Sequence, residues 1–130
     1  MSQVRVTDQI NLMLVDGPGA LAGVAEALEK AGVNIEGSSA IKVGGTGVRL
    51  VVDNVEAAKA AIGGMGTLTM QKTIVVKFDD NKPGMIASVA RKLGDAGISI
   101  ENFYHAASGS LFLIVGDANT DKAVEALKGM

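Results

Sequence analysis

An internal repeat is the sequence feature that most limits how this chain can fold. Residues Asp16–Glu36 (DGPGALAGVAEALEKAGVNIE) return without a gap as Asn81–Glu101 (NKPGMIASVARKLGDAGISIE), and ten of the 21 aligned positions are identical. The copies are 65 residues apart in a chain of 130. We therefore expect two copies of one structural unit. Because units of about 65 residues bury only a modest core alone, the two should pack together.

Each copy predicts a strand, a tight turn, a helix and a second strand. Apolar residues recur at i, i+3, i+4 and i+7, which is the pattern of a helix that packs one face on a sheet. These residues are Leu21, Val24, Ala25 and Leu28 in the first copy, and Ile86, Val89, Ala90 and Leu93 in the second. A proline fixes φ just before each helix, and a glycine stands where a left-handed cap would end it. The prolines are Pro18 and Pro83, and the glycines are Gly32 and Gly97.

Both halves predict the order strand, strand, helix, strand, strand, helix. In the first half the predicted segments are strands 3–7 and 9–15, the repeat helix, strands 34–43 and 48–52, and helix 55–62. In the second half they are strands 68–71 and 74–78, helix 85–96, strands 99–106 and 111–115, and helix 121–128. GGTG at 44–47 and Ser108-Gly109 are hairpin signals. Asp53 or Asn54 can cap the second helix.

This order predicts an α+β fold of two ferredoxin-like βαββαβ units, with antiparallel sheets and helices on one face. Residues 8–72 form the first predicted unit, whose fourth strand is about 68–72. Residues 73–130 form the second, which lacks a fourth strand, so we expect residues 2–7 to supply it and the terminal strands to be exchanged. In the alternative, each leading strand folds back as a hairpin. Thr7-Asp8 and Gln71-Lys72 lack the Gly or Asn that such turns favour.

Composition argues against several classes of function. Fourteen acidic and twelve basic residues give a net charge of −2, and the four aromatic residues are not interleaved with basic ones, so nucleic acid is not expected as a partner. No apolar run reaches the roughly 18 residues of a membrane span. The absence of cysteine excludes disulfides and thiolate metal sites. We expect a soluble, cytoplasmic protein.

No pattern of catalytic or metal-binding residues stands out. The chain has one histidine, His105, and no Gly-x-Ser-x-Gly motif, and no metal-type residues cluster with that histidine. GGTG lacks the Lys-Ser/Thr ending of a phosphate loop. The sequence therefore predicts neither an enzyme nor a cofactor nor a metal site.

The repeated pattern strand, [D/N]-x-P-G, helix, A-G-[V/I]-[N/S]-I, strand resembles the ACT domain, a small regulatory module that binds ligands. The resemblance covers both halves, nearly the whole chain. It implies paired units with sheets side by side and an amino acid bound in the interface, next to the turn before the first helix. Physical chemistry favours the same place. A helix N-terminus offers free N–H groups to a carboxylate, and Gly19 and Gly84 leave room for its approach.

Resemblance to serine-binding ACT domains implies the polar positions. They are Asp16 and Asn81 before the prolines, and Asn34 and Ser99 after the helices, with Asn81 facing Asn34 and Asp16 facing Ser99. A family histidine two residues before the first position is absent, since Leu14 and Asp79 hold its places. The full predicted site comprises Asp16, Gly17, Pro18, Gly19, Ala20, Leu21, Asn34 and Ile35, with Asn81, Lys82, Pro83, Gly84, Met85, Ile86, Ser99 and Ile100.

The two copies differ within this predicted site. Gly17 stands against Lys82 in the turn, and residues 37–40 (GSSA) stand against residues 102–105 (NFYH) in the second strand. We therefore expect two unequal sites or one working site.

These features predict a stand-alone regulatory sensor that binds a free amino acid at the interface between units. The alternative is an ACT-like protein–protein interaction module without a small ligand. The resemblance also leaves room for a homodimer and for a regulated partner protein.

Overall fold

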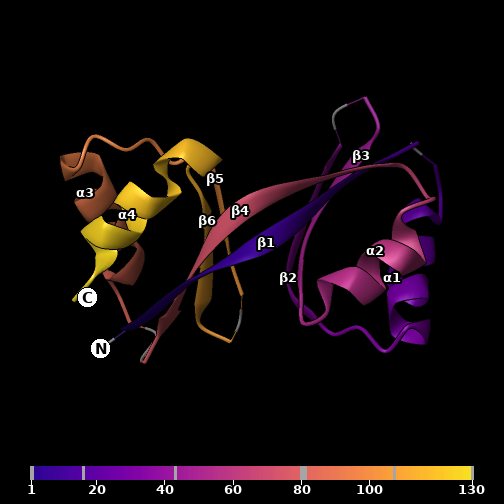
Figure 1. The fold of residues 1–130 in the computed structure, drawn as a ribbon, viewed down its shortest axis with the longest axis horizontal. Helices are drawn as coiled ribbons and strands as arrows, with labels where there is room; N and C mark the ends of the chain where they lie inside the picture. The colour runs from indigo at the N-terminus through magenta and orange to yellow at the C-terminus, as the bar shows by residue number, and fades with distance from the viewer. Residues whose placement is uncertain (1, 16, 43, 80–81, 107, 130) are drawn as a thin grey trace. The chain divides into compact units, whose positions relative to one another are not determined.

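The computed structural model describes residues 2–15, 17–42, 44–79, 82–106 and 108–129, and it has the predicted α+β class (Figure 1). The first half contains β1 (Ser2–Leu14), α1 (Ala20–Lys30), β2 (Ile35–Lys42), β3 (Thr46–Val52) and α2 (Val55–Ile62). The second half contains β4 (Thr67–Phe78), α3 (Met85–Asp95), β5 (Asn102–His105), β6 (Ser110–Ile114), a 3-10 turn (Asp117–Asn119) and α4 (Thr120–Leu127). The strands follow the order β2-β3-β1-β4-β6-β5.

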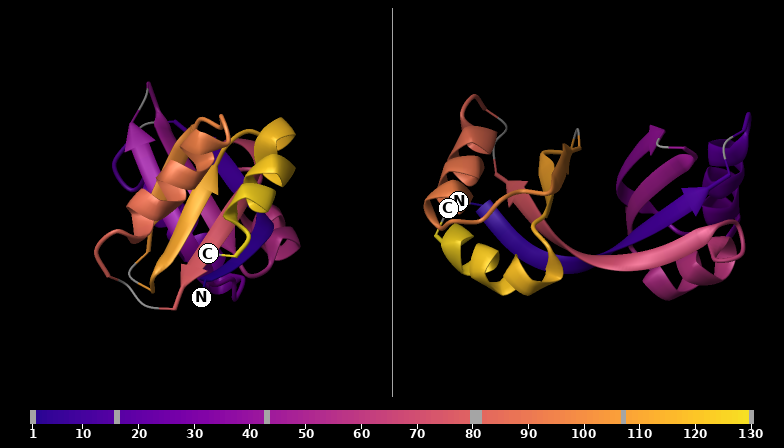
Figure 2. Two further views of the ribbon diagram at one scale, coloured as in Figure 1. Left: turned by 90° about the vertical axis from the view of Figure 1, so that its left-hand side faces the viewer. Right: turned by 90° about the horizontal axis from the view of Figure 1, so that it is seen from above.

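The chain forms two compact units. The N-unit is Asp8–Met70, and the C-unit is Met1–Thr7 together with Gln71–Met130. In the N-unit, α1 and α2 bury apolar residues against β1 and β3. In the C-unit, α3 and α4 do the same against β4 and β6 (Figure 2). Each unit thus has the predicted layer of helices on one face of antiparallel strands.

Strands β1 and β4 are longer than the sequence predicts. The expected strands Gln3–Thr7 and Gln9–Val15 are one continuous strand, β1, which ends at Leu14. Likewise Leu68–Gln71 and Ile74–Phe78 form the single strand β4. No glycine, proline or asparagine interrupts either junction, so the extended backbone continues through it. The hairpin alternative for the leading strands is therefore wrong.

Glycines in the left-handed conformation stand at both ends of the repeated helices, as the sequence predicts for the C-terminal end. At the end of α1, Gly32 has φ +70°. Its N–H donates to the Glu29 carbonyl at 3.0 Å, and the Val33 N–H donates to the Leu28 carbonyl at 3.0 Å. This pattern satisfies carbonyls that the helix leaves open. Before the helices, Gly19 and Gly84 have φ +82° and +94°.

The repeat contains a one-residue difference that the gapless alignment hides. Five residues separate β1 from α1, whereas six separate β4 from α3. Leu14 ends β1 in the N-unit core, and Phe78 ends β4 in the C-unit core. The structural counterpart of Leu14 is therefore Phe78, although a displacement of 65 residues would match Leu14 with the exposed Asp79.

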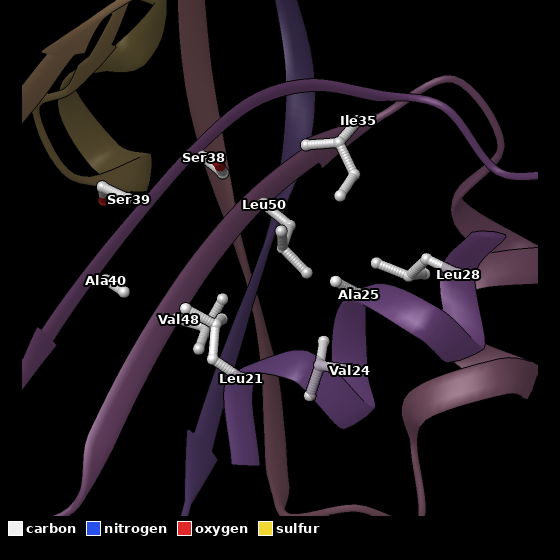
Figure 3. Close-up of a pocket in the computed structure, with 10 residues that line it drawn as sticks. All are labelled: Leu21, Val24, Ala25, Leu28, Ile35, Ser38, Ser39, Ala40, Val48 and Leu50. Carbon is white, nitrogen blue, oxygen red and sulfur yellow. The ribbon is translucent and has the colours of Figure 1, made fainter. Parts of the chain in front are cut away.

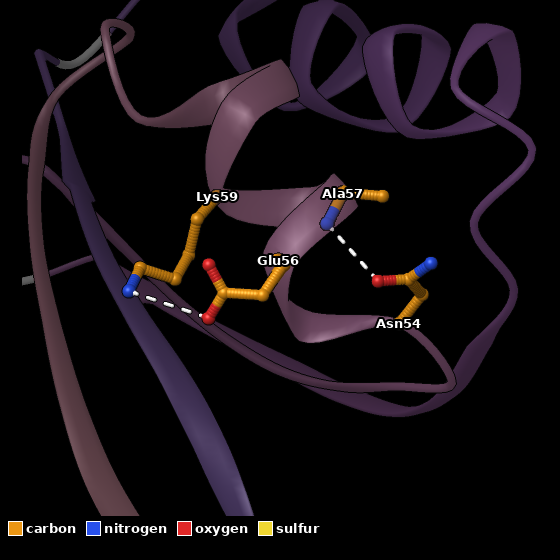
Figure 4. A network of polar contacts seen from close by, with 4 residues as sticks. All are labelled: Asn54, Glu56, Ala57 and Lys59. Carbon is orange, nitrogen blue, oxygen red and sulfur yellow. Dashed lines mark hydrogen bonds and ion pairs between the residues drawn. The ribbon is translucent and has the colours of Figure 1, made fainter.

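The second helix of the N-unit is capped by Asn54 rather than by Asp53. The Asn54 side-chain Oδ1 accepts a hydrogen bond from the Ala57 N–H at 3.1 Å (Figure 4). Glu56 and Lys59 approach to 3.9 Å on the exposed surface of the same helix, a pair that contributes little to stability.

Strand β5 is shorter than the predicted strand 99–106. The Glu101 N–H donates to the Ile114 carbonyl at 2.8 Å, and the paired ladder begins at Asn102. Gly109, with φ +90°, forms the predicted turn to β6.

Candidate functional site

The N-unit contains a cavity of about 400 Å³ between α1 and the strands β2 and β3 (Figure 3). We call it the α1–β2 cavity. Its floor consists of four buried core residues, Val24, Leu28, Val48 and Leu50. Its rim consists of more exposed residues from the two elements that face each other, namely Leu21 and Ala25 from α1 and Ile35, Ser38 and Ala40 from β2. The arrangement is a mostly apolar recess with an open side, as small-molecule sites commonly are.

Two small residues on β2 leave space for this cavity. Ser38 pairs with Leu50 and Ala40 pairs with Val48 across the β2–β3 ladder. Paired residues share a face of a sheet, and Leu50 and Val48 belong to the core beneath the helices. Ser38 and Ala40 therefore lie on the helix side, where short side chains do not reach α1. Ser39 pairs with Arg49, so its side chain leaves from the opposite face.

Two of the predicted site residues come together in this cavity. Leu21, in the first turn of α1, is 49% exposed, and Ile35, the first residue of β2, is 36% exposed. Both line the α1–β2 cavity. The predicted turn residues Gly17, Pro18 and Gly19 are exposed just before α1, and the Ala20 N–H donates to the Gly17 carbonyl at 3.3 Å. Ala20 itself packs against the N-unit core.

The predicted polar residue Asn34 lies beside the cavity. It lines a shallower depression of about 390 Å³, which shares Ala25, Leu28 and Ile35 with the α1–β2 cavity. The Asn34 N–H donates to Asp53 Oδ1 at 3.0 Å, and the Asp53 N–H donates to the Asn34 carbonyl at 3.1 Å. These two bonds fix the backbone of Asn34 where α1 leads into β2.

The predicted residues of the C-unit stand at the equivalent positions around α3. Lys82, Pro83 and Gly84 are exposed before α3, and Ser99 is exposed after it. Ile86, the counterpart of Leu21, is 37% exposed. Met85 and Ile100 are partly buried against the C-unit core.

The predicted polar residues Asp16 and Asn81 lie outside the described residues. The expected facing of Asn81 with Asn34, and of Asp16 with Ser99, stays a prediction. The same holds for a ligand bound at the interface between units.

The C-unit places aromatic rings where the N-unit has Ser38 and Ala40. Phe103 pairs with Leu113 and His105 pairs with Leu111, in the same ladder positions. The His105 ring lies edge-on to Phe78, with ring centroids 6.4 Å apart and an interplanar angle of 77°. Two rings therefore occupy the face that is left open in the N-unit.

The cavity was predicted from the sequence only in part, because Ser38 and Ala40 of β2 and Val48 and Leu50 of β3 were not among the expected site residues. The sequence signal for the cavity lies in the difference between GSSA at residues 37–40 and NFYH at the equivalent residues 102–105. A small side chain that replaces an aromatic one in a repeat predicts a recess, provided that both point to the helix side. Only the strand register establishes that direction.

Within the residues that the structure describes, no group of three His, Cys, Asp or Glu side chains could hold a metal ion. Among the same residues, no helix is long and apolar enough to cross a membrane.

Comparisons with solved structures find the same fold in several other proteins. Protein BT0572 from Bacteroides thetaiotaomicron is 25% identical, with a TM-score of 0.81 over 96% of this chain and 88% of that one. The ligand-free regulatory subunit of aspartate kinase from Thermus thermophilus is 18% identical, with a TM-score of 0.65 over 95% and 93%. A putative C-terminal regulatory domain of aspartate kinase from Porphyromonas gingivalis W83 is 15% identical, with a TM-score of 0.63 over 98% and 94%.

No family model matches the sequence, and no curated protein matches it either. The structural likeness nonetheless identifies the architecture. The regulatory domains of aspartate kinase consist of tandem ACT units, and this chain has the same fold. The predicted resemblance to tandem ACT domains is thus confirmed at the level of the fold.

Proposed function

We propose that this protein is a regulatory sensor that binds a free amino acid in the α1–β2 cavity and is not an enzyme. The observation that carries the proposal is the cavity itself, an apolar recess of about 400 Å³ that opens beside the first turn of α1. Pockets of this size suit small molecules. The regulatory fold shared with aspartate kinase regulatory subunits supports the same role.

The start of α1 supplies a place for the charged end of an amino acid. Gly19 precedes the helix in the left-handed conformation and has no side chain of its own that could cap the first turn. N–H groups at a helix start favour a carboxylate, with a contribution of about 0.3–2 kcal/mol. Micromolar to millimolar binding needs about 4–8 kcal/mol. Burial of the ligand side chain against the cavity floor must therefore provide most of the affinity.

Binding of the ligand in the cavity would be transmitted through a change in the contacts that α1 and β2 make. A ligand that touches both α1 and β2 stabilises the arrangement in which these elements are held together, and so shifts the population toward it. A partner protein, or a second copy in a homodimer, that contacts α1 or β2 would sense this shift. We expect these events in the cytoplasm.

The experiment that tests this function is a thermal unfolding screen against the twenty free amino acids, with hits measured by calorimetry. A ligand present at a hundred times its dissociation constant should add about 2.7 kcal/mol to the free energy of unfolding. A selective rise in Tm supports the sensor. No rise with any amino acid contradicts it.

A second candidate function, a ligand-free interaction module, is favoured by the free edge of the sheet. Strand β2 stands at one end of the strand order, and Ile41 on that strand is 50% exposed. Unpaired strand edges with apolar residues are surfaces on which another chain can add a strand. If no amino acid binds while sedimentation shows self-association that Ile41→Lys abolishes, this second function is correct.

A further inference from the structure

We infer that the amino acid bound in the α1–β2 cavity has an apolar side chain, which enters the N-unit between α1 and β2. This inference rests on the proposed function and narrows its ligand class. It also assigns binding to the N-unit rather than to both units. Three properties of the cavity carry it, namely its floor, its uncharged lining and its contrast with the C-unit.

The floor of the cavity is made of the hydrophobic core. Leu28 is fully buried, and Val24, Val48 and Leu50 are 2–3% exposed, yet all four border the recess. Whatever enters the cavity therefore meets only aliphatic carbon at its deep end. An apolar side chain gains from that contact, because its surface leaves water without losing a hydrogen bond.

No charged side chain lines the cavity among the described residues. The two polar lining residues are Ser38, which is exposed at the rim, and Ser39, whose side chain leaves from the other face. A ligand side chain with an ammonium, carboxylate or amide group would lose its water at the floor without a partner. The ligand's α-carboxylate can lie at the start of α1, and its α-ammonium group can stay hydrated at the open side of the cavity.

The C-unit offers a natural comparison within the same chain. The C-unit residues that correspond to the cavity floor are also buried and aliphatic, namely Val89, Leu93, Leu111 and Leu113. The difference lies at the strand, where rings replace the two small residues Ser38 and Ala40. His105 contacts the ring of the core residue Phe78 edge-on, at the strand position that Ala40 has in the N-unit.

The expected preference follows from the size of the ligand side chain. Each buried methylene contributes roughly fourfold in affinity. Leucine has three carbons more than alanine in its side chain, which predicts about 60-fold tighter binding. Asparagine resembles leucine in shape but carries an amide. The difference in affinity between the two therefore measures the effect of side-chain polarity at similar size.

The experiment is isothermal titration calorimetry of leucine, alanine and asparagine with the full chain, supported by the thermal screen. Two variants accompany the wild type. Ser38→Phe combined with Ala40→His gives the N-unit the residues of the C-unit and fills the cavity. The matched control, Ala60→Leu, adds apolar volume at an exposed position of α2 outside the cavity. Should the double variant fail to fold, Ser38→Leu alone provides the same readout.

We expect leucine to bind about 60-fold more tightly than alanine, and more tightly than asparagine. Filling the cavity should weaken leucine binding at least tenfold, and the control should leave it unchanged. Tighter binding of asparagine or a charged amino acid than of leucine would overturn the ligand class while leaving the sensor function standing. Leucine binding that survives the filled cavity would overturn the location. If none of the twenty amino acids binds, the proposed function itself fails.

Discussion

Gly19 provides a sensitive test of the turn that leads into α1. Its φ of +82° is in the left-handed region, and a Cβ added there would meet nothing within 4 Å. Gly19→Ala therefore changes the backbone preference without a steric clash. For a residue other than glycine, that conformation costs about 1–2 kcal/mol. We expect the free energy of unfolding of the N-unit to fall by this amount.

Gly23 serves as the matched control in the same helix. It lies in the interior of α1 without a positive φ, and a Cβ there also meets nothing within 4 Å. Gly23→Ala should raise stability by about 0.5–1 kcal/mol, because alanine favours the helix. Replacing glycine by alanine at these two positions, four residues apart, is thus expected to change the free energy of unfolding in opposite directions.

Urea denaturation followed by far-ultraviolet circular dichroism measures both variants. In a unit of this size, 1 kcal/mol corresponds to about 4–8 °C in Tm, so thermal unfolding should resolve the difference as well. If Gly19→Ala were as stable as wild type, or more stable, the left-handed turn before α1 would be refuted.

Three further predictions concern the other unit and the helix cap. Asn54→Ala should cost about 1 kcal/mol of unfolding free energy, measured by urea denaturation, because it removes the side-chain cap of α2; a neutral result would contradict that cap. We propose that the N-terminal strand completes the C-unit, so deletion of residues 2–7 should abolish hydrogen-exchange protection mainly in the C-unit, whereas loss confined to the rest of β1 would disprove the exchange. His105→Ala should lower C-unit stability by about 0.5–1.5 kcal/mol through loss of the edge contact with Phe78, and an unchanged denaturation midpoint would argue against that contact.

The repeat allowed most of the fold to be predicted from the sequence. Helical periodicity and the flanking Pro and Gly residues located α1 and α3, since these signals depend on the local chain alone. The continuity of β1 and β4 was missed. Each of these strands passes from one compact unit into the other near its middle. No local sequence signal marks that point, because the backbone stays extended on both sides of Thr7 and Gln71.

The site could be predicted only in part. Leu21 and Ile35 were identified because they flank motifs that both copies share. Ser38 and Ala40 were not, because their importance comes from which face of β2 they occupy and from the core residues opposite them. The bulge between Ile35 and Gly37 shifts that register, and no sequence pattern marks the bulge.

The most direct test of the central claim is an amide NMR titration of the full chain with leucine. We expect the largest chemical-shift changes on Leu21, Ile35, Ser38 and Ala40, with small changes in the C-unit. Changes centred on the equivalent C-unit residues Ile86 and Phe103, or no saturable changes anywhere, would contradict it.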